Sequence, residues 1–121
     1  MAIVNKKIGL TDTEVLAVPL GSRFAVTTIM VCNTASADTG GGNDTTFDLH
    51  FVPNGQAKGN TDPNANQILN DLKIAGADTF TLDTEKIVLE GGDRIIAVSQ
   101  SPANLAMTVS SVSYTHLTLP T

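Results

Sequence analysis

The sequence is poor in charge, and the charge it has is not clustered. Charged residues make up 16% of the 121-residue chain, whereas about a quarter is usual in globular proteins. Surface helices depend on Glu, Lys and Arg, so this scarcity favours β-structure and loops. The chain has seven Lys and Arg, a formal net charge of −5, and one adjacent basic pair, Lys6-Lys7. Because a phosphate-binding surface needs clustered basic residues, we predict no direct contact with nucleic acid.

The single cysteine, Cys32, excludes an internal disulfide, so the stability of the fold must come from packing. This is typical of proteins that fold in a reducing cytoplasm. Cys32 lies in an apolar run, and we expect it to be a small buried core residue rather than a nucleophile. Residues 1–10 lack a signal-peptide pattern. No apolar run is long enough to span a membrane, so no membrane partner is expected.

Apolar and β-branched residues recur in short segments that are separated by turn residues. The alternation of apolar and polar side chains is typical of strands that bury one face. We predict strands over residues 2–10, 14–19, 23–33, 44–53, 67–74, 79–83, 86–90, 94–99 and 105–111. The apolar residues of segment 67–74 fall at mixed spacing, so a short helical turn is the alternative there. Seven to nine short strands without a helix indicate an all-β fold, an antiparallel β-sandwich that is jelly-roll-like. A chain of this length forms one domain, which we place over residues 1–111.

Two segments give more detailed expectations. Residues 23–33 are apolar on both faces and rich in β-branched side chains, which predicts a strand covered on both sides. Glu90-Gly91-Gly92-Asp93 lies between two apolar runs, and glycine adopts positive φ without steric cost. This pattern predicts a β-hairpin that joins residues 86–90 to residues 94–99.

Two long polar loops interrupt the predicted strands. Residues 34–43 are Gly-rich and of low complexity, which predicts a mobile loop, and residues 54–66 form a second polar loop. Loops of this length in a compact domain are usually functional, disordered or packed against a partner. We predict that both loops face protein partners, and that exposed sheet edges also make contacts, by strand addition between subunits. The side chains expected to make these contacts are Asp38, Asn43, Asn54, Lys58, Asn60, Asp62 and Asn64.

No group of side chains has the spacing of a catalytic or metal site. Residues 44–53 alternate so that Phe47, Leu49 and Phe51 face the core. His50 then faces solvent on the other side, where it has no catalytic partner. Residues 62–66 place oxygen ligands at alternate positions, but the glycine and glutamate of an EF-hand are missing, and turn formation explains these residues without a metal. The chain has no Trp and little aromatic surface to hold a sugar between paired carboxylates. We therefore predict no catalytic residue, no metal and no cofactor.

The C-terminal residues 112–121, VSYTHLTLPT, differ in composition from the rest of the chain. They carry no charge and contain three Thr and two Leu in an unpatterned run. The string resembles the in-frame translation of a transposon-type sequencing adaptor, of the kind left on reading frames assembled from environmental samples. The resemblance implies that the native sequence stops near Ser111 and that the native C-terminus is missing. The alternative is a native final strand followed by a Pro-terminated tail.

Three stretches of residues 1–111 follow a recognisable layout: MAIVNKKIGLTDTEVLAVPLGS, then VTTIMVCNTA, then TFTLDTEKIVLEGGDRIIAVSQS. They give an opening strand, turn and strand that ends in Pro, a core strand that ends in Asn-Thr, and a late Leu-x-x-Gly-Asp-x-Ile segment. In this layout the chain resembles small virion structural proteins of tailed bacteriophages. The resemblance implies a non-enzymatic β-sandwich in many copies on the head, neck or tail of the particle. It also implies assembly in the host cytoplasm, with other virion proteins and further copies of the chain as partners.

Two other classes of function stay open. A carbohydrate- or surface-binding module, such as a fibre or adhesin head, would present an exposed aromatic platform or an ordered metal in the loops. A small hydrolase would place His50 within hydrogen-bond reach of a carboxylate in a cleft. The virion protein implied by the resemblance needs neither feature.

Overall fold

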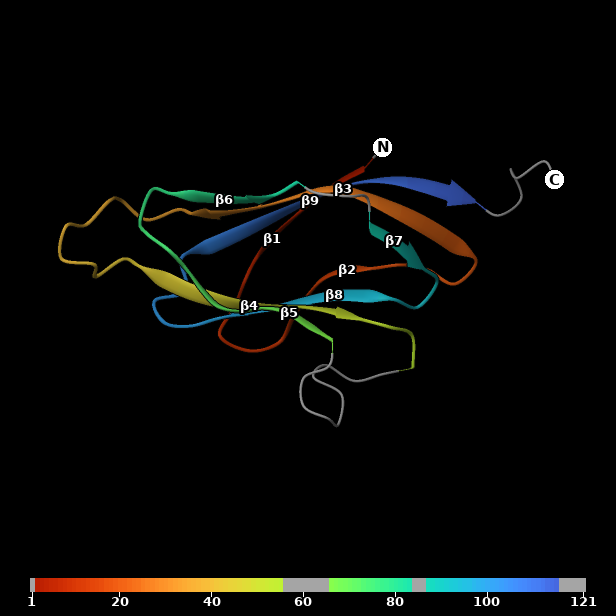
Figure 1. Cartoon of the computed structure of the whole chain (residues 1–121), viewed down its shortest axis with the longest axis horizontal. Helices are drawn as coiled ribbons and strands as arrows, with labels where there is room; N and C mark the ends of the chain where they lie inside the picture. Colours follow the sequence, from red (N-terminus) through yellow and green to blue (C-terminus); the bar gives the residue numbers. More distant parts are fainter. Residues whose placement is uncertain (1, 56–65, 84–86, 116–121) are drawn as a thin grey trace.

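A computed structural model of the chain describes residues 2–55, 66–83 and 87–115, and within these residues every regular element is a strand. The strands form two layers that face each other (Figure 1). Their bounds are β1 Ala2–Lys7, β2 Thr13–Ala17, β3 Ser22–Asn33, β4 Thr45–Val52, β5 Gln67–Ile74, β6 Thr79–Leu82, β7 Ile87–Glu90, β8 Arg94–Ser99 and β9 Leu105–Thr115. The predicted all-β fold is therefore confirmed, and the predicted bounds of β5 and β8 agree with the structure.

The two layers are two antiparallel sheets. Sheet A has the order β1-β9-β3-β6, and β7 also pairs with β3. Since β6 pairs with residues 29–32 of β3 and β7 with residues 23–26, the two short strands follow each other along one edge of β3. Sheet B has the order β2-β8-β4-β5. β1 lies at one edge of sheet A.

Strand pairing is nested around the connection between β4 and β5. These two strands pair with each other in sheet B, and β3 pairs with β6 and β7 in sheet A. Next outward, β2 pairs with β8 in sheet B and β1 with β9 in sheet A. The chain therefore forms one long antiparallel hairpin that is coiled into two layers. Successive pairs of strands along this hairpin lie alternately in sheet B and sheet A.

The core fills the space between the two sheets. Alternate residues of the strands point inward, because successive side chains of a strand lie on opposite faces. Val31, Met107 and Val109 supply the sheet A side, and Leu49 and Ile95 supply the sheet B side, all fully buried. Full burial of an aliphatic side chain of this size contributes about 1.5–3 kcal/mol.

The hairpin predicted around Gly91-Gly92 is wrong. β7 belongs to sheet A and β8 to sheet B, so this turn carries the chain from one sheet to the other. The turn is closed locally, since Asp93 N donates to Glu90 O at 2.9 Å and Glu90 N donates to an Asp93 carboxylate oxygen at 2.8 Å. A Cβ on Gly91 would lie 2.8 Å from Leu20 Cα, so the packing of two turns requires glycine there. The same turn residues suit a hairpin and a crossing between sheets, which is why the local pattern misleads.

The prediction that the strand at residues 23–33 is covered on both sides is also wrong. β3 contains a bulge between Val26 and Thr28, which moves the apolar run across from one face to the other. Beyond the bulge, Ile29 and Val31 are buried, whereas Met30 is 42% exposed and Cys32 is exposed. Cys32 is therefore a surface residue of sheet A and not the core residue expected from its neighbours.

The final strand is longer than predicted. β9 continues past Ser111, and residues 112–115 pair with residues 22–25 of β3. This pairing shows that the segment continues the strand, but pairing does not identify the origin of a sequence. The adaptor interpretation of residues 112–121 stays a prediction.

Candidate partner-binding surfaces

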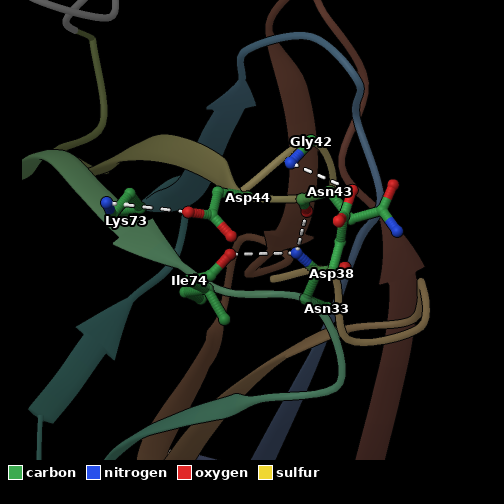
Figure 2. A network of polar contacts seen from close by, with 7 residues as sticks. All are labelled: Asn33, Asp38, Gly42, Asn43, Asp44, Lys73 and Ile74. Atoms are coloured by element: carbon green, nitrogen blue, oxygen red, sulfur yellow. Dashed lines mark hydrogen bonds and ion pairs between the residues drawn. The ribbon is translucent and has the colours of Figure 1, made fainter. Parts of the chain in front are cut away.

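The loop between β3 and β4 is anchored by a buried asparagine at the end of β3. Asn33 is 1% exposed, and its Nδ2 donates to Asn43 O at 2.7 Å and to Ile74 O at 2.9 Å. Its Oδ1 accepts from Ala35 N at 3.0 Å. One side chain thus joins the two ends of the loop to the end of β5 (Figure 2).

Within this loop, Asp38 organises the glycines. Its carboxylate accepts a hydrogen bond from Gly40 N at 2.9 Å. It also accepts one from Gly42 N at 3.1 Å, which Figure 2 shows. An Asp that receives backbone N–H groups a few residues ahead is a turn-forming device. The predicted Gly-rich loop thus contains a hydrogen-bonded turn, and its mobility stays a prediction.

The base of the same loop is tied to sheet B by an ion pair. Lys73 Nζ lies 3.6 Å from an Asp44 carboxylate oxygen, and the lysine side chain is 66% exposed. Such an exposed pair contributes at most about 1 kcal/mol. The pair therefore helps to place the loop, and the buried Asn33 holds it.

Two of the predicted contact residues therefore have internal partners. Asp38 binds two backbone N–H groups, and Asn43 Nδ2 donates to Ser36 O at 2.9 Å. Their side chains shape the loop, and what the loop offers to a partner is its outer backbone and its remaining polar groups. Their role in partner contact stays a prediction.

The second predicted loop begins at the opposite end of the sandwich. Asn54 N donates to an Asp93 carboxylate oxygen at 2.9 Å, beside the turn between β7 and β8. Figure 1 shows this end and the β3–β4 loop at opposite ends of the long axis. The structure thus does not bring Asp38 and Asn43 together with Asn54. The other four predicted residues, Lys58, Asn60, Asp62 and Asn64, lie outside the described residues.

The prediction that His50 is solvated is wrong, although its face is predicted correctly. His50 pairs with Ile96 of β8 on the outer face of sheet B, opposite to the inward Phe47 and Leu49. It is nevertheless 2% exposed, and its Nδ1 lies 3.0 Å from Asn66 Oδ1. Alternation along a strand identifies a face but not what covers it. The hydrolase hypothesis required a carboxylate at this position, and the bonded group is an amide.

The four phenylalanines also bear on the alternative functions. Phe47 is fully buried, and Phe24, Phe51 and Phe80 are partly buried and packed against the core. None of the four serves as the flat exposed ring on which a sugar stacks. In the described part of the chain, no group of three or more His, Cys, Asp or Glu is placed to hold a metal ion, and no helix there could cross a membrane.

A third surface was not predicted from the sequence. The outer face of sheet A exposes Ile3 on β1, Met30 on β3 and Val88 on β7. The alternation of Thr28, Met30 and Cys32 indicates that these three side chains share the outer face. The bulge between Val26 and Thr28 changes the alternation along β3, so the pattern of the whole strand does not show it.

Comparison of the chain with protein-family models, curated proteins and solved structures finds no match.

Proposed function

We propose that the chain is a non-enzymatic structural protein of a tailed-bacteriophage particle, which acts through protein–protein contacts on the head, neck or tail. It would assemble in the host cytoplasm and reside in the virion. Its partners would be other virion proteins and further copies of the chain. The proposal combines the sequence layout of residues 1–111 with the strand order.

The nested strand pairing is the observation that carries the proposal. If β6 and β7 are counted as one interrupted strand, the fold consists of two four-stranded sheets. The paired strands of one long antiparallel hairpin are distributed alternately between these sheets. This order supports the jelly-roll interpretation, a double-sheet fold that recurs in viral capsid and lectin domains. Fold alone does not specify function, so the proposal relies on the resemblance of the sequence layout to virion proteins in choosing the capsid class.

The sheet edges carry features that discourage uncontrolled strand addition. β1 ends in Lys6 and Lys7. On β5, Asp71 has positive φ and its N–H donates to an Asp48 carboxylate oxygen at 2.8 Å, so the pairing with β4 is irregular at that point. We therefore propose that the partner contacts are made by the β3–β4 loop, by the segment that begins at Asn54 and by an outer face rather than by the edges.

A carbohydrate- or surface-binding module remains the second candidate, because lectin domains use the same double-sheet architecture. The inward packing of the four phenylalanines weighs against it. Binding of the purified protein to a glycan array would favour this second candidate.

The proposed function is tested by the reading frames that flank this one in its source genome. Genes for capsid, portal or tail proteins on the same contig are the expected result. A neighbourhood of metabolic genes on both sides would contradict the proposal, whatever the oligomeric state of the protein.

A further inference from the structure

The outer face of sheet A has cross-strand rows in which most side chains are short and uncharged. The central row runs from Asn5 on β1 through Thr108 on β9 and Met30 on β3 to Thr81 on β6. Each is half-buried or exposed, since the core lies on the other side of the sheet. Short side chains such as Thr lose little conformational entropy when they are covered.

This face also concentrates exposed apolar surface. Ile3 is 65% exposed, Val88 52% and Met30 42%, and these are three of the six large apolar side chains that the described residues expose. The other three are Leu10 and Leu20 in connections and Ile68 on β5. Apolar surface that gathers on one flat face marks an interaction site more than scattered exposure does.

Charge indicates which partner fits the face. In the central row and the two rows beside it, the single charged side chain is Lys7 at the β1 edge, on a chain whose net charge is −5. Beyond Val88, the same face carries the exposed ion pair of Arg23 and Glu90, whose charges balance within one copy. At the opposite edge of the Lys7 row lies Thr79, preceded by the exposed Asp78. A second copy turned about a two-fold axis parallel to the strands would set β1 of one copy over β6 of the other. Each Lys7 would then lie beside an Asp78 of the other copy.

The size of the face agrees with that of a stable dimer interface. β1, β9, β3, β6 and β7 contain 6, 11, 12, 4 and 4 residues, and each residue occupies about 3.4 Å along its strand and about 4.8 Å across the sheet. The face therefore covers about 600 Å², so that two copies would bury about 1,200 Å², the lower limit of a standard protein–protein interface.

We infer that the outer face of sheet A is a self-association surface, on which two copies of the chain pack face to face about a two-fold axis parallel to the strands. This deepens the proposed function, on which its biological role rests, by naming the face through which copies meet. Met30 lies near the centre of the contact, and the Lys7–Asp78 pairs lie at its two edges.

The test compares two glutamate substitutions in the purified full chain by sedimentation velocity over a range of protein concentrations. Met30→Glu introduces a carboxylate into the centre of the face, where two copies would oppose like charges. Ile68→Glu is the matched control, because Ile68 is an apolar side chain of similar exposure, 47%, on sheet B. We expect Met30→Glu to raise the dimer dissociation constant at least about tenfold, and Ile68→Glu to leave it unchanged. Far-UV circular dichroism and urea unfolding establish that both variants are folded.

Charge reversal tests the orientation of the two copies. Lys7→Glu alone is expected to weaken the dimer, and Lys7→Glu combined with Asp78→Lys is expected to restore it. Failure of the double variant to recover association would overturn the proposed axis.

Cys32 gives a measurement on the unmodified chain. It is exposed and lies in the Lys7 row, on the covered face. Its reaction with a thiol reagent should slow as the protein concentration rises through the dissociation constant. The inference would be overturned by a wild-type chain that stays monomeric and whose Cys32 reacts at the same rate at all protein concentrations. A Met30→Glu variant that dimerises as tightly as wild type would also overturn it. The flanking genes test the virion assignment independently, so the failure of one proposal can be distinguished from that of the other.

Discussion

Asn33 provides the most quantitative test of how the two sheets and the β3–β4 loop are held together. Its side chain is fully enclosed and makes three hydrogen bonds, to Ala35 N, Asn43 O and Ile74 O. Asn33→Ala removes all three. The loop and the end of β5 would lose their common anchor.

The expected loss follows from the number of bonds. Each intramolecular hydrogen bond contributes about 1 kcal/mol net, and more when a buried group is left unsatisfied. Three bonds therefore give a loss of about 3 kcal/mol, a large part of the roughly 5–15 kcal/mol that stabilises a typical domain. With a urea m-value of about 1.5 kcal/mol/M, the unfolding midpoint would fall by about 2 M.

Equilibrium urea unfolding measures this loss, with two further variants for comparison. Asn43→Ala removes one exposed side-chain bond, to Ser36 O, and should cost less than about 1 kcal/mol. Asn33→Asp replaces the donating amide with an oxygen that faces two carbonyl oxygens, so it should be less stable than Asn33→Ala. Equal losses for Asn33→Ala and Asn43→Ala, or an Asn33→Asp variant as stable as wild type, would refute this account of the anchor.

Three further predictions use the same unfolding measurement. His50→Ala should cost about 2 kcal/mol, because it empties a buried position and removes the bond to Asn66, whereas a loss below about 0.5 kcal/mol would indicate a solvated histidine. Gly91→Ala should destabilise the protein by about 2 kcal/mol or more, since its Cβ would overlap a neighbouring turn. Gly21 has positive φ but open space around it, so Gly21→Ala should cost only about 1 kcal/mol. A larger loss for Gly21→Ala than for Gly91→Ala would contradict the packing of the turns. Removal of the exposed Arg23–Glu90 pair by Glu90→Gln should cost less than about 1 kcal/mol, and a larger loss would mean that the turn depends on this pair.

Local sequence patterns predict the strands and their faces well, because alternation reflects the pleat of the strand itself. In β4, the pattern places Phe47 and Leu49 inward and His50 outward, as the structure does. Which residues cover His50 on the outer face depends on the position of residues distant in the sequence, here Asn66. A local sequence pattern carries no information about that position.

Features that depend on pairing between distant strands could not be predicted locally. The turn at Gly91-Gly92 has the residues of a hairpin, yet Leu89 is buried in sheet A and Ile95 in sheet B. The bulge in β3 shifts the faces by one residue, so a run that is apolar on both sides exposes Met30 and Cys32. The candidate self-association surface was missed for this reason.

The Asn33 anchor was missed for a different reason. In the sequence, Asn33 is the polar end of an apolar strand and is indistinguishable from a turn residue. Its partners Asn43 and Ile74 are ten and forty-one residues away, and only the fold brings them within hydrogen-bond distance.

The most direct test of the central claim is mass spectrometry of phage particles purified by density gradient from the source of the sequence. A virion structural protein predicts peptides from residues 1–111 in the particle fraction, at a copy number comparable with that of the known head or tail components. Peptides confined to the soluble cell fraction, with none in the particles, would contradict the account.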